Sequence, residues 1–215
     1  MKISGFKMIL IACVLTVGAS FLMVCDDDDD NGPDYIQSDA TEIVIYVAGA
    51  SAGTLGGNLS ALSGSSLRDK VDSLCTAEKP SGVTSPNVRA LISLKSSDQV
   101  SDFPAHYGTP GDLPVKDSTG TSTIADNWAD LMDGSIDVSL WDAGLTPVSW
   151  TTSLTGSDVN GNYLSAYSCN GWTSTDSGAS VAWGSAGATD SSWFSVQNEG
   201  YCSASSNTRI MCITY

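Results

Sequence analysis

The sequence predicts one α+β domain, residues 43–215, that is cross-linked by two disulfides. An N-terminal export signal and an acidic tether precede this domain. Three observations support this prediction. Short apolar runs alternate with polar, glycine-rich turns, one segment repeats its apolar residues at helical spacing, and four cysteines follow the leader. Of the 215 residues, 41% are hydrophobic and 15% are charged, which is typical of a folded chain rather than a disordered one.

Residues 1–24 have the features of a secretory signal peptide. Lys2 and Lys7 precede 17 uncharged residues, 8–24, and Cys25 follows directly. This arrangement resembles the bacterial lipoprotein signal, in which the cysteine is acylated and becomes the new N-terminus. We therefore expect a lipid anchor on Cys25 in the cell envelope, at the outer membrane or cell surface rather than the inner membrane. The length of the stretch also permits an uncleaved anchor or an ordinary cleaved signal.

Residues 25–42 form a predicted acidic tether. Five consecutive aspartates, Asp26–Asp30, repel one another and stay solvated, which favours an extended spacer over a metal site. The chain has a net charge of −15, and residues 43–215 keep 16 acidic and 7 basic side chains, a net charge near −9. Binding to nucleic acid or heparin depends on Lys and Arg, so we expect neither partner.

The first half of the domain contains the clearest elements. Ile43–Ala48 is a continuous apolar run rich in β-branched residues, which predicts a buried strand. Ser66 and Asp69 have the spacing of a capping box, which predicts that a helix begins there and runs to Cys75. The apolar residues of that helix share one face: Leu67, Val71, Leu74 and Cys75.

Later elements are shorter. Val88–Leu94 is a second apolar run, and Asp126–Met132 is a candidate for a short helix with Trp128, Leu131 and Met132 on one side. Short strands separated by polar turns follow. In 157–161, Asn-Gly is expected to supply the positive φ angles of a hairpin turn. Arg209–Thr214 is the predicted last strand.

Four cysteines lie in the domain: Cys75, Cys169, Cys202 and Cys212. An even number in an exported chain predicts two disulfides, with three possible connectivities. Zinc is the competing interpretation, but no two of these cysteines have the close spacing of a zinc site, and His106 is the only histidine. We therefore expect no metal and no other cofactor.

Six segments, in order along the domain, resemble one known family. They are the glycine-rich loop 53–57, then 89–93, 127–135, 156–161, 168–174 and 210–213. Together they resemble endostatin and a related group of bacterial lipoproteins of unassigned function, which share the C-type lectin-like fold. The resemblance implies this fold for residues 43–215. It also implies that Cys75 pairs with Cys212 and Cys169 with Cys202.

The residues that bind metal or heparin in such proteins are missing from this sequence. Sugar-binding members hold calcium with Glu-Pro-Asn or Gln-Pro-Asp and with Trp-Asn-Asp, whereas this chain has Thr146-Pro147-Val148 and Trp193-Phe194-Ser195. Endostatin-type proteins use N-terminal histidines for zinc and clustered arginines for heparin, and this chain has neither feature. We therefore expect a binding domain that is independent of calcium.

The sequence contains no recognisable catalytic motif. His106 has no predicted nucleophile beside it, and no nucleophile elbow or phosphate-binding loop is present. We expect a non-catalytic domain that binds a protein or glycan ligand. The alternatives are an envelope hydrolase that uses His106 and a calcium-dependent lectin.

The tryptophans are the candidates for ligand contacts. Trp172, Trp183 and Trp193 lie in or beside the segment between Cys169 and Cys202, where aromatic anchors in a polar surround could bind a ligand. Of these, Trp183 and Trp193 are the best candidates for exposed ligand contacts, although we expect even these two to be partly buried. We expect Trp128, Trp150 and Trp172 to lie in the core, because they belong to the segments that carry the rest of the fold.

Overall fold

The computed structural model describes residues 40–49, 56–203 and 208–215, and within these it describes the side chains of all but 198–201. The predicted signal peptide, Cys25 and most of the predicted tether lie outside the described residues. No helix in the described part of the chain has the length and apolarity needed to cross a membrane.

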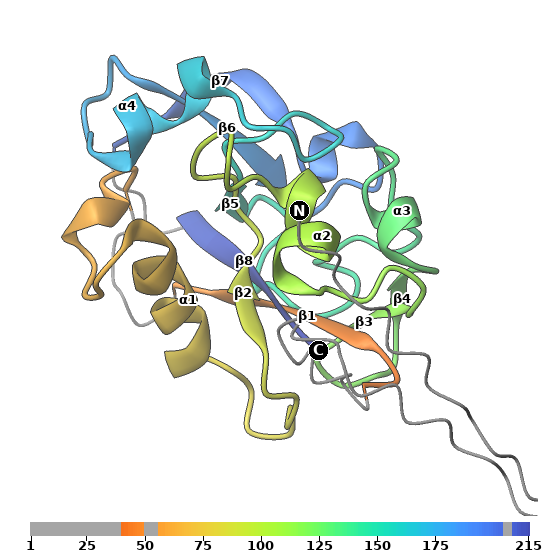
Figure 1. Cartoon of the computed structure of the whole chain (residues 1–215). Helices are drawn as coiled ribbons and strands as arrows, with labels where there is room; N and C mark the ends of the chain where they lie inside the picture. The colour runs from red at the N-terminus through yellow and green to blue at the C-terminus, as the bar shows by residue number, and fades with distance from the viewer. Residues whose placement is uncertain (1–39, 50–55, 204–207) are drawn as a thin grey trace, which may run out of the picture. The chain divides into compact units, whose positions relative to one another are not determined.

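The domain is of the mixed α+β class, as predicted, with an eight-stranded sheet and a few short helices (Figure 1). The strands are β1 (Ile43–Ala48), β2 (Val88–Ala90), β3 (Val115–Asp117), β4 (Thr123–Ala125), β5 (Thr152–Leu154), β6 (Ser180–Ser185), β7 (Val196–Tyr201) and β8 (Thr208–Thr214). The helices are α1 (Leu67–Ala77), α2 (Phe103–Tyr107), α3 (Trp128–Leu131) and α4 (Cys169–Trp172). The strand order is β4-β3-β1-β8-β5-β6-β7, and β2 also pairs with β8.

The first and last strands of the domain are neighbours in the middle of this sheet. β1 and β8 are antiparallel, with Ile45 opposite Ile213, and β3 runs parallel to β1 on its other side. β1 has the predicted bounds, and β8 begins one residue earlier than predicted. Val44 lies opposite Thr214, so the domain begins and ends at the same end of the sheet.

Alternate residues of β1 and β8 enter two separate hydrophobic layers, as the period of two in a strand requires. On one face, Ile45 and Ile213 are buried in a cluster that includes Phe103 of α2 and Trp128 of α3. On the other face, Tyr46 of β1 and Cys212 of β8 are buried in a cluster that includes Val71 and Cys75 of α1. In Figure 1, α1 therefore lies on one side of the central strands and α2 and α3 on the other.

Helix α1 agrees closely with its prediction. Ser66 accepts a hydrogen bond from the Asp69 N–H (3.1 Å), and the Asp69 carboxylate accepts one from the Ser66 N–H (3.1 Å), which completes the capping box. Val71 and Cys75 are fully buried on the predicted face. Helix α3 is also confirmed, with Asn127 as its N-cap and Trp128 buried.

Two disulfides cross-link the domain, as predicted. Cys75, near the end of α1, pairs with Cys212 in β8, and Cys169 pairs with Cys202. These are the pairs that the family resemblance implies. The first bridge spans 137 residues of sequence and the second spans 33, so in the chain-entropy model they stabilise the fold by about 5 and about 4 kcal/mol.

Within the apolar run 88–94, Val88–Ala90 form strand β2, and the Ile92 N–H then donates to the Ala90 carbonyl (2.9 Å) in a tight turn. One turn differs from its local prediction. The hairpin at 157–163 is present, but only Gly161 has a positive φ (81°), and Asn160 does not. The turn is therefore of type I followed by a left-handed glycine, not a turn with two positive φ angles.

Helix α4 is a left-handed turn. All four of its residues have positive φ: Cys169 (51°), Asn170 (56°), Gly171 (68°) and Trp172 (66°). For residues other than glycine this conformation costs about 1–2 kcal/mol each. The disulfide to Cys202 and the complete burial of Trp172 hold the turn in place.

Candidate functional site

The most highly connected polar cluster in the described structure lies where α1 meets strand β2. Ala90 of β2 turns its peptide groups towards α1: its N–H donates to Asp72 (2.8 Å) and its carbonyl accepts from Arg68 (2.8 Å). Arg68 and Asp72 are one helical turn apart on α1. Together they satisfy the edge of β2 as a neighbouring strand would, so this edge offers no free backbone groups at Ala90.

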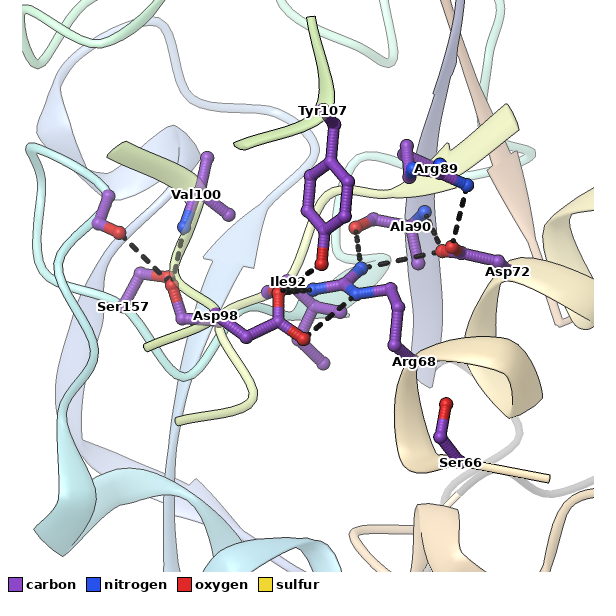
Figure 2. Close-up of polar contacts among 12 residues, drawn as sticks. Ser66, Arg68, Asp72, Arg89, Ala90, Ile92, Asp98, Val100, Tyr107 and Ser157 are labelled. Carbon is purple, nitrogen blue, oxygen red and sulfur yellow. Dashed lines mark hydrogen bonds and ion pairs between the residues drawn. The ribbon is translucent and has the colours of Figure 1, made fainter. Parts of the chain in front are cut away.

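Every donor group of the Arg68 guanidinium has a partner. Figure 2 shows the side chain between Asp98 on one side and Asp72 on the other. Asp98 binds Nε and Nη2 (3.2 and 2.7 Å), and the Ile92 carbonyl accepts from Nη2 (2.9 Å). Nη1 donates to Asp72 (3.4 Å) as well as to Ala90. Such a bidentate, buried pair fixes the geometry of the elements that carry it.

Arg89 forms the outer part of the cluster. Its Nη1 atom lies 3.1 Å from Asp72, and its guanidinium lies over the Tyr107 ring, 4.7 Å from the centroid. The Tyr107 hydroxyl in turn donates to Asp98 (3.0 Å). Arg89 differs from Arg68 because its Nε–H is buried without a hydrogen-bond partner.

Burial and ion pairing act against each other at these groups. Burial lowers the pKa of Arg68, but the hydrogen bond that Arg68 donates to Asp98 and the charges of Asp72 and Asp98 raise it above its ordinary value. Burial raises the pKa of Asp72 in spite of both arginines and the Ala90 N–H. Burial therefore outweighs ion pairing in its effect on the pKa of Asp72, whereas ion pairing outweighs burial in its effect on the pKa of Arg68.

A hollow of about 460 Å³ opens beside this cluster between α1 and β2. It is lined by Asp69, Asp72, Ser73, Thr76, Pro86, Asn87, Val88 and Arg89. Hydroxyl, amide, guanidinium and carboxylate groups could hydrogen-bond a small polar molecule there. The same charged groups already bind one another, however, so their evident role is to fasten α1 to β2.

The structure corrects the predicted ligand surface. Trp172 and Trp193 are both fully buried. The Trp172 indole N–H donates to the Ser93 carbonyl (3.2 Å), and the Trp193 ring packs against Phe194 with 4.9 Å between centroids. Both therefore belong to the core rather than to a binding surface. Trp183 is half-buried and packs at the margin of the cluster under α1.

The exposed tryptophans are Trp141 (46% exposed) and Trp150 (66% exposed). No other large hydrophobic side chain in the described part of the chain is as exposed. The expectation that Trp150 lies in the core was wrong. The Thr151 N–H donates to the Val148 carbonyl (3.2 Å), so Trp150 lies at a central position of a tight turn, where its side chain stays exposed.

His106 is exposed on α2, and its ring lies against Tyr107 with 4.6 Å between centroids. Within the described residues it has no hydrogen bond or ion pair, and no nucleophile is oriented by it. The same residues contain no group of three or more histidine, cysteine or acidic side chains arranged to hold a metal ion.

The sequence held two signals that pattern reasoning missed, one for the exposed tryptophans and one for the cluster at β2. Residues 117–208 contain ten acidic side chains and no Lys, Arg or His, and both exposed tryptophans lie in this stretch. Arg68 and Asp72 have the i, i+4 spacing of a helical ion pair, which could have predicted their contact. Their role at the edge of β2 depends on tertiary structure.

Comparison with known proteins gave no family for this chain. No protein-family model matches it, and no curated protein matches it significantly.

Proposed function

We propose that the protein is an exported, lipid-anchored protein of the cell envelope, with one non-catalytic domain that binds a protein or glycan ligand without calcium. In this proposal Cys25 carries the lipid, residues 25–42 form the tether, and residues 43–215 form an endostatin-like domain of the C-type lectin-like fold. The anchor lies at the outer membrane or the cell surface.

The disulfides support the proposed fold. Cys75 and Cys212 join the helix to the final strand, and Cys169 and Cys202 close a loop between the later elements. This is the arrangement that the resemblance to endostatin implies. The mixed α+β architecture and the ordered series of matching segments support the same assignment.

The observation that carries the binding function is the exposure of Trp141 and Trp150. Tryptophan is costly to leave in water and is enriched in the centres of binding interfaces. The other tryptophans are buried or half-buried, so the two exposed ones are exceptions in this chain. The ligand surface is therefore proposed here rather than at Trp172 and Trp193.

Binding can be tested with the full-length chain in detergent, on a glycan array and against extracts of envelope and host matrix, with and without EDTA. We expect binding that persists in EDTA and is lost in the double variant Trp141→Ala, Trp150→Ala. Binding abolished by EDTA would contradict calcium independence. Binding that the double variant retains would place the ligand surface elsewhere.

The anchor can be tested by metabolic labelling with an alkynyl fatty acid. We expect label on the wild type and on Cys13→Ser, and none on Cys25→Ser. Cys13→Ser is a matched control because it removes the other cysteine of the leader. Equal labelling of Cys25→Ser would overturn the lipoprotein assignment.

A further inference from the structure

Trp141 and Trp150 lie on two segments that backbone hydrogen bonds join through a single residue, Ala186. The carbonyl of Ala186 accepts a hydrogen bond from the Trp141 N–H (2.9 Å), and the Ala186 N–H donates to the Thr151 carbonyl (3.0 Å). Trp141 and Thr151 thus flank one residue on its two sides. Neighbouring strands are about 4.8 Å apart, so the Trp141 and Thr151 backbones lie roughly 10 Å from each other. Trp150 immediately precedes Thr151.

Exposed carboxylates lie on the same hydrogen-bonded segments as these two tryptophans. Asp142 follows Trp141 in the chain and is exposed. The Ile136 N–H donates to the Thr189 carbonyl (2.9 Å), which places the exposed carboxylates of Asp137 and Asp190 beside this contact. We refer to Trp141, Trp150, Asp137, Asp142 and Asp190 as the acidic tryptophan surface.

No positive charge balances this surface from its own part of the chain. Residues 117–208 contain no Lys, Arg or His. Among the described residues, none of the three carboxylates takes part in an ion pair. Asp142 accepts a hydrogen bond from the Ser139 hydroxyl (2.7 Å), and Asp190 accepts one from the Ser192 N–H (2.9 Å), so the partners of these two carboxylates are neutral groups.

We propose that the acidic tryptophan surface binds a protein partner through a segment rich in lysine or arginine. A cation over the face of an indole ring is attracted by the ring, and tryptophan is the strongest aromatic partner for it. Carboxylates beside the rings would bind the same cations and speed the encounter. This inference rests on the proposed binding function and names the class of its partner.

The observations favour a cationic segment over the other possible ligands. Polyanions such as heparin would be repelled by three uncompensated carboxylates. A partner with an apolar surface would find no exposed aliphatic residue near the rings, since the large hydrophobic side chains exposed in the described structure are these two tryptophans alone. A neutral glycan could stack on the rings but would gain nothing from the charge, so it is an outcome of the test.

The test uses the full-length chain in detergent and a short fluorescent peptide in which lysine alternates with glycine. Its control is the same peptide with acetylated lysines, which keep their length and lose their charge. We expect the lysine peptide to bind, the acetylated peptide not to bind, and rising ionic strength to weaken binding. We expect Trp141→Ala with Trp150→Ala to weaken binding roughly tenfold.

Two further double variants distinguish the effect of this surface on peptide binding from the effect of the overall negative charge of the chain. Asp137→Asn with Asp142→Asn should weaken peptide binding severalfold, whereas Asp112→Asn with Asp176→Asn removes the same charge outside the surface and should leave it unchanged. Circular dichroism checks that each variant is folded. The proposal is overturned if the tryptophan variant binds the peptide like the wild type, or if both aspartate variants weaken binding equally.

Failure of this inference can be told apart from failure of the proposed function. If a neutral β-glucan oligosaccharide binds at the tryptophans and the lysine peptide does not, the binding function stands and the cationic partner is excluded. If neither probe binds and the array and extracts also yield no ligand, the binding function itself fails.

Discussion

Residues 43–116 contain six acidic and six basic side chains, whereas residues 117–208 contain ten acidic and no basic ones. In the first region, charges are used inside the fold. Arg68, Asp72, Arg89 and Asp98 bind one another and the edge of β2. In the second region, carboxylates have no local cation and are held by other means.

The second region holds its aspartates by hydrogen bonds within tight turns. In five places an aspartate accepts from the backbone N–H two residues further on, at distances of 2.8–3.0 Å. These aspartates are Asp117, Asp133, Asp158, Asp176 and Asp190. Such turns explain the many Ser, Thr, Asn and Gly residues that follow Asp in this half. They also leave the negative charge uncompensated, so it remains available to a partner.

The largest expected effect concerns the bridge that joins the first region to the last strand, β8. Cys75→Ser with Cys212→Ser should lower the free energy of unfolding by about 5 kcal/mol, because the bridge constrains the longer loop. Cys169→Ser with Cys202→Ser, inside the second region, should cost about 4 kcal/mol. Urea denaturation under matched conditions measures both. A larger loss from the second pair would mean that the left-handed turn, rather than loop closure, dominates.

Breaking the buried ion cluster should cost nearly as much. Arg68→Ala leaves Asp72 and Asp98 without their main cation, and we expect about 3–5 kcal/mol of destabilisation. The matched control is Lys116→Ala, which removes the partly exposed pair with Glu42 and should cost about 0–1 kcal/mol. If the two variants lost the same stability, the first region would not depend on its internal charges.

A glycine substitution tests the turns of the second region. Gly161 has a φ of 81°, and a methyl group there would lie 2.8 Å from the Ser101 backbone nitrogen. Gly161→Ala should therefore cost about 2–3 kcal/mol. Gly120→Ala is the control, because Gly120 has a φ of 71° in open space and should show the backbone cost alone, about 1–2 kcal/mol. Thermal unfolding measures the loss of stability in both variants, and the difference between the two losses gives the cost of steric overlap at Gly161.

The smallest effect should come from the charge of one turn aspartate. Burial raises the pKa of Asp117, but hydrogen bonds from Thr119, Ser122 and Thr121 lower it below the ordinary 3.8. The ionised form therefore stabilises the fold above pH 3.8, and this contribution is lost as the pH falls through the lower pKa of the folded state. At pH 7, Asp117→Asn should be about 1–2 kcal/mol less stable.

The pH dependence provides the check on that prediction. The gap in stability between wild type and Asp117→Asn should shrink as the pH is lowered below 3.8, because the wild-type carboxyl then becomes protonated. Urea denaturation at a series of pH values measures the gap. A gap that stayed constant at all pH values would show that the turn does not depend on the charge.

Local sequence signals determined several parts of this protein. The capping box at Ser66 and the spacing of Val71 and Cys75 specify α1, since a helix is fixed by contacts within a few residues. The apolar run 43–48 similarly specifies β1. The even number of cysteines indicated two disulfides, and the resemblance supplied the pairs that the structure contains.

Other features were decided only by tertiary structure. Trp150 and Trp193 have similar polar neighbours in the sequence, yet one is 66% exposed and the other fully buried, because only the fold determines what covers each ring. The left-handed turn at α4 is held by a disulfide partner 33 residues away, and Arg68 meets Asp98 across 30 residues. Contacts between distant segments leave no local pattern, so the edge cluster and the acidic tryptophan surface emerge only after folding.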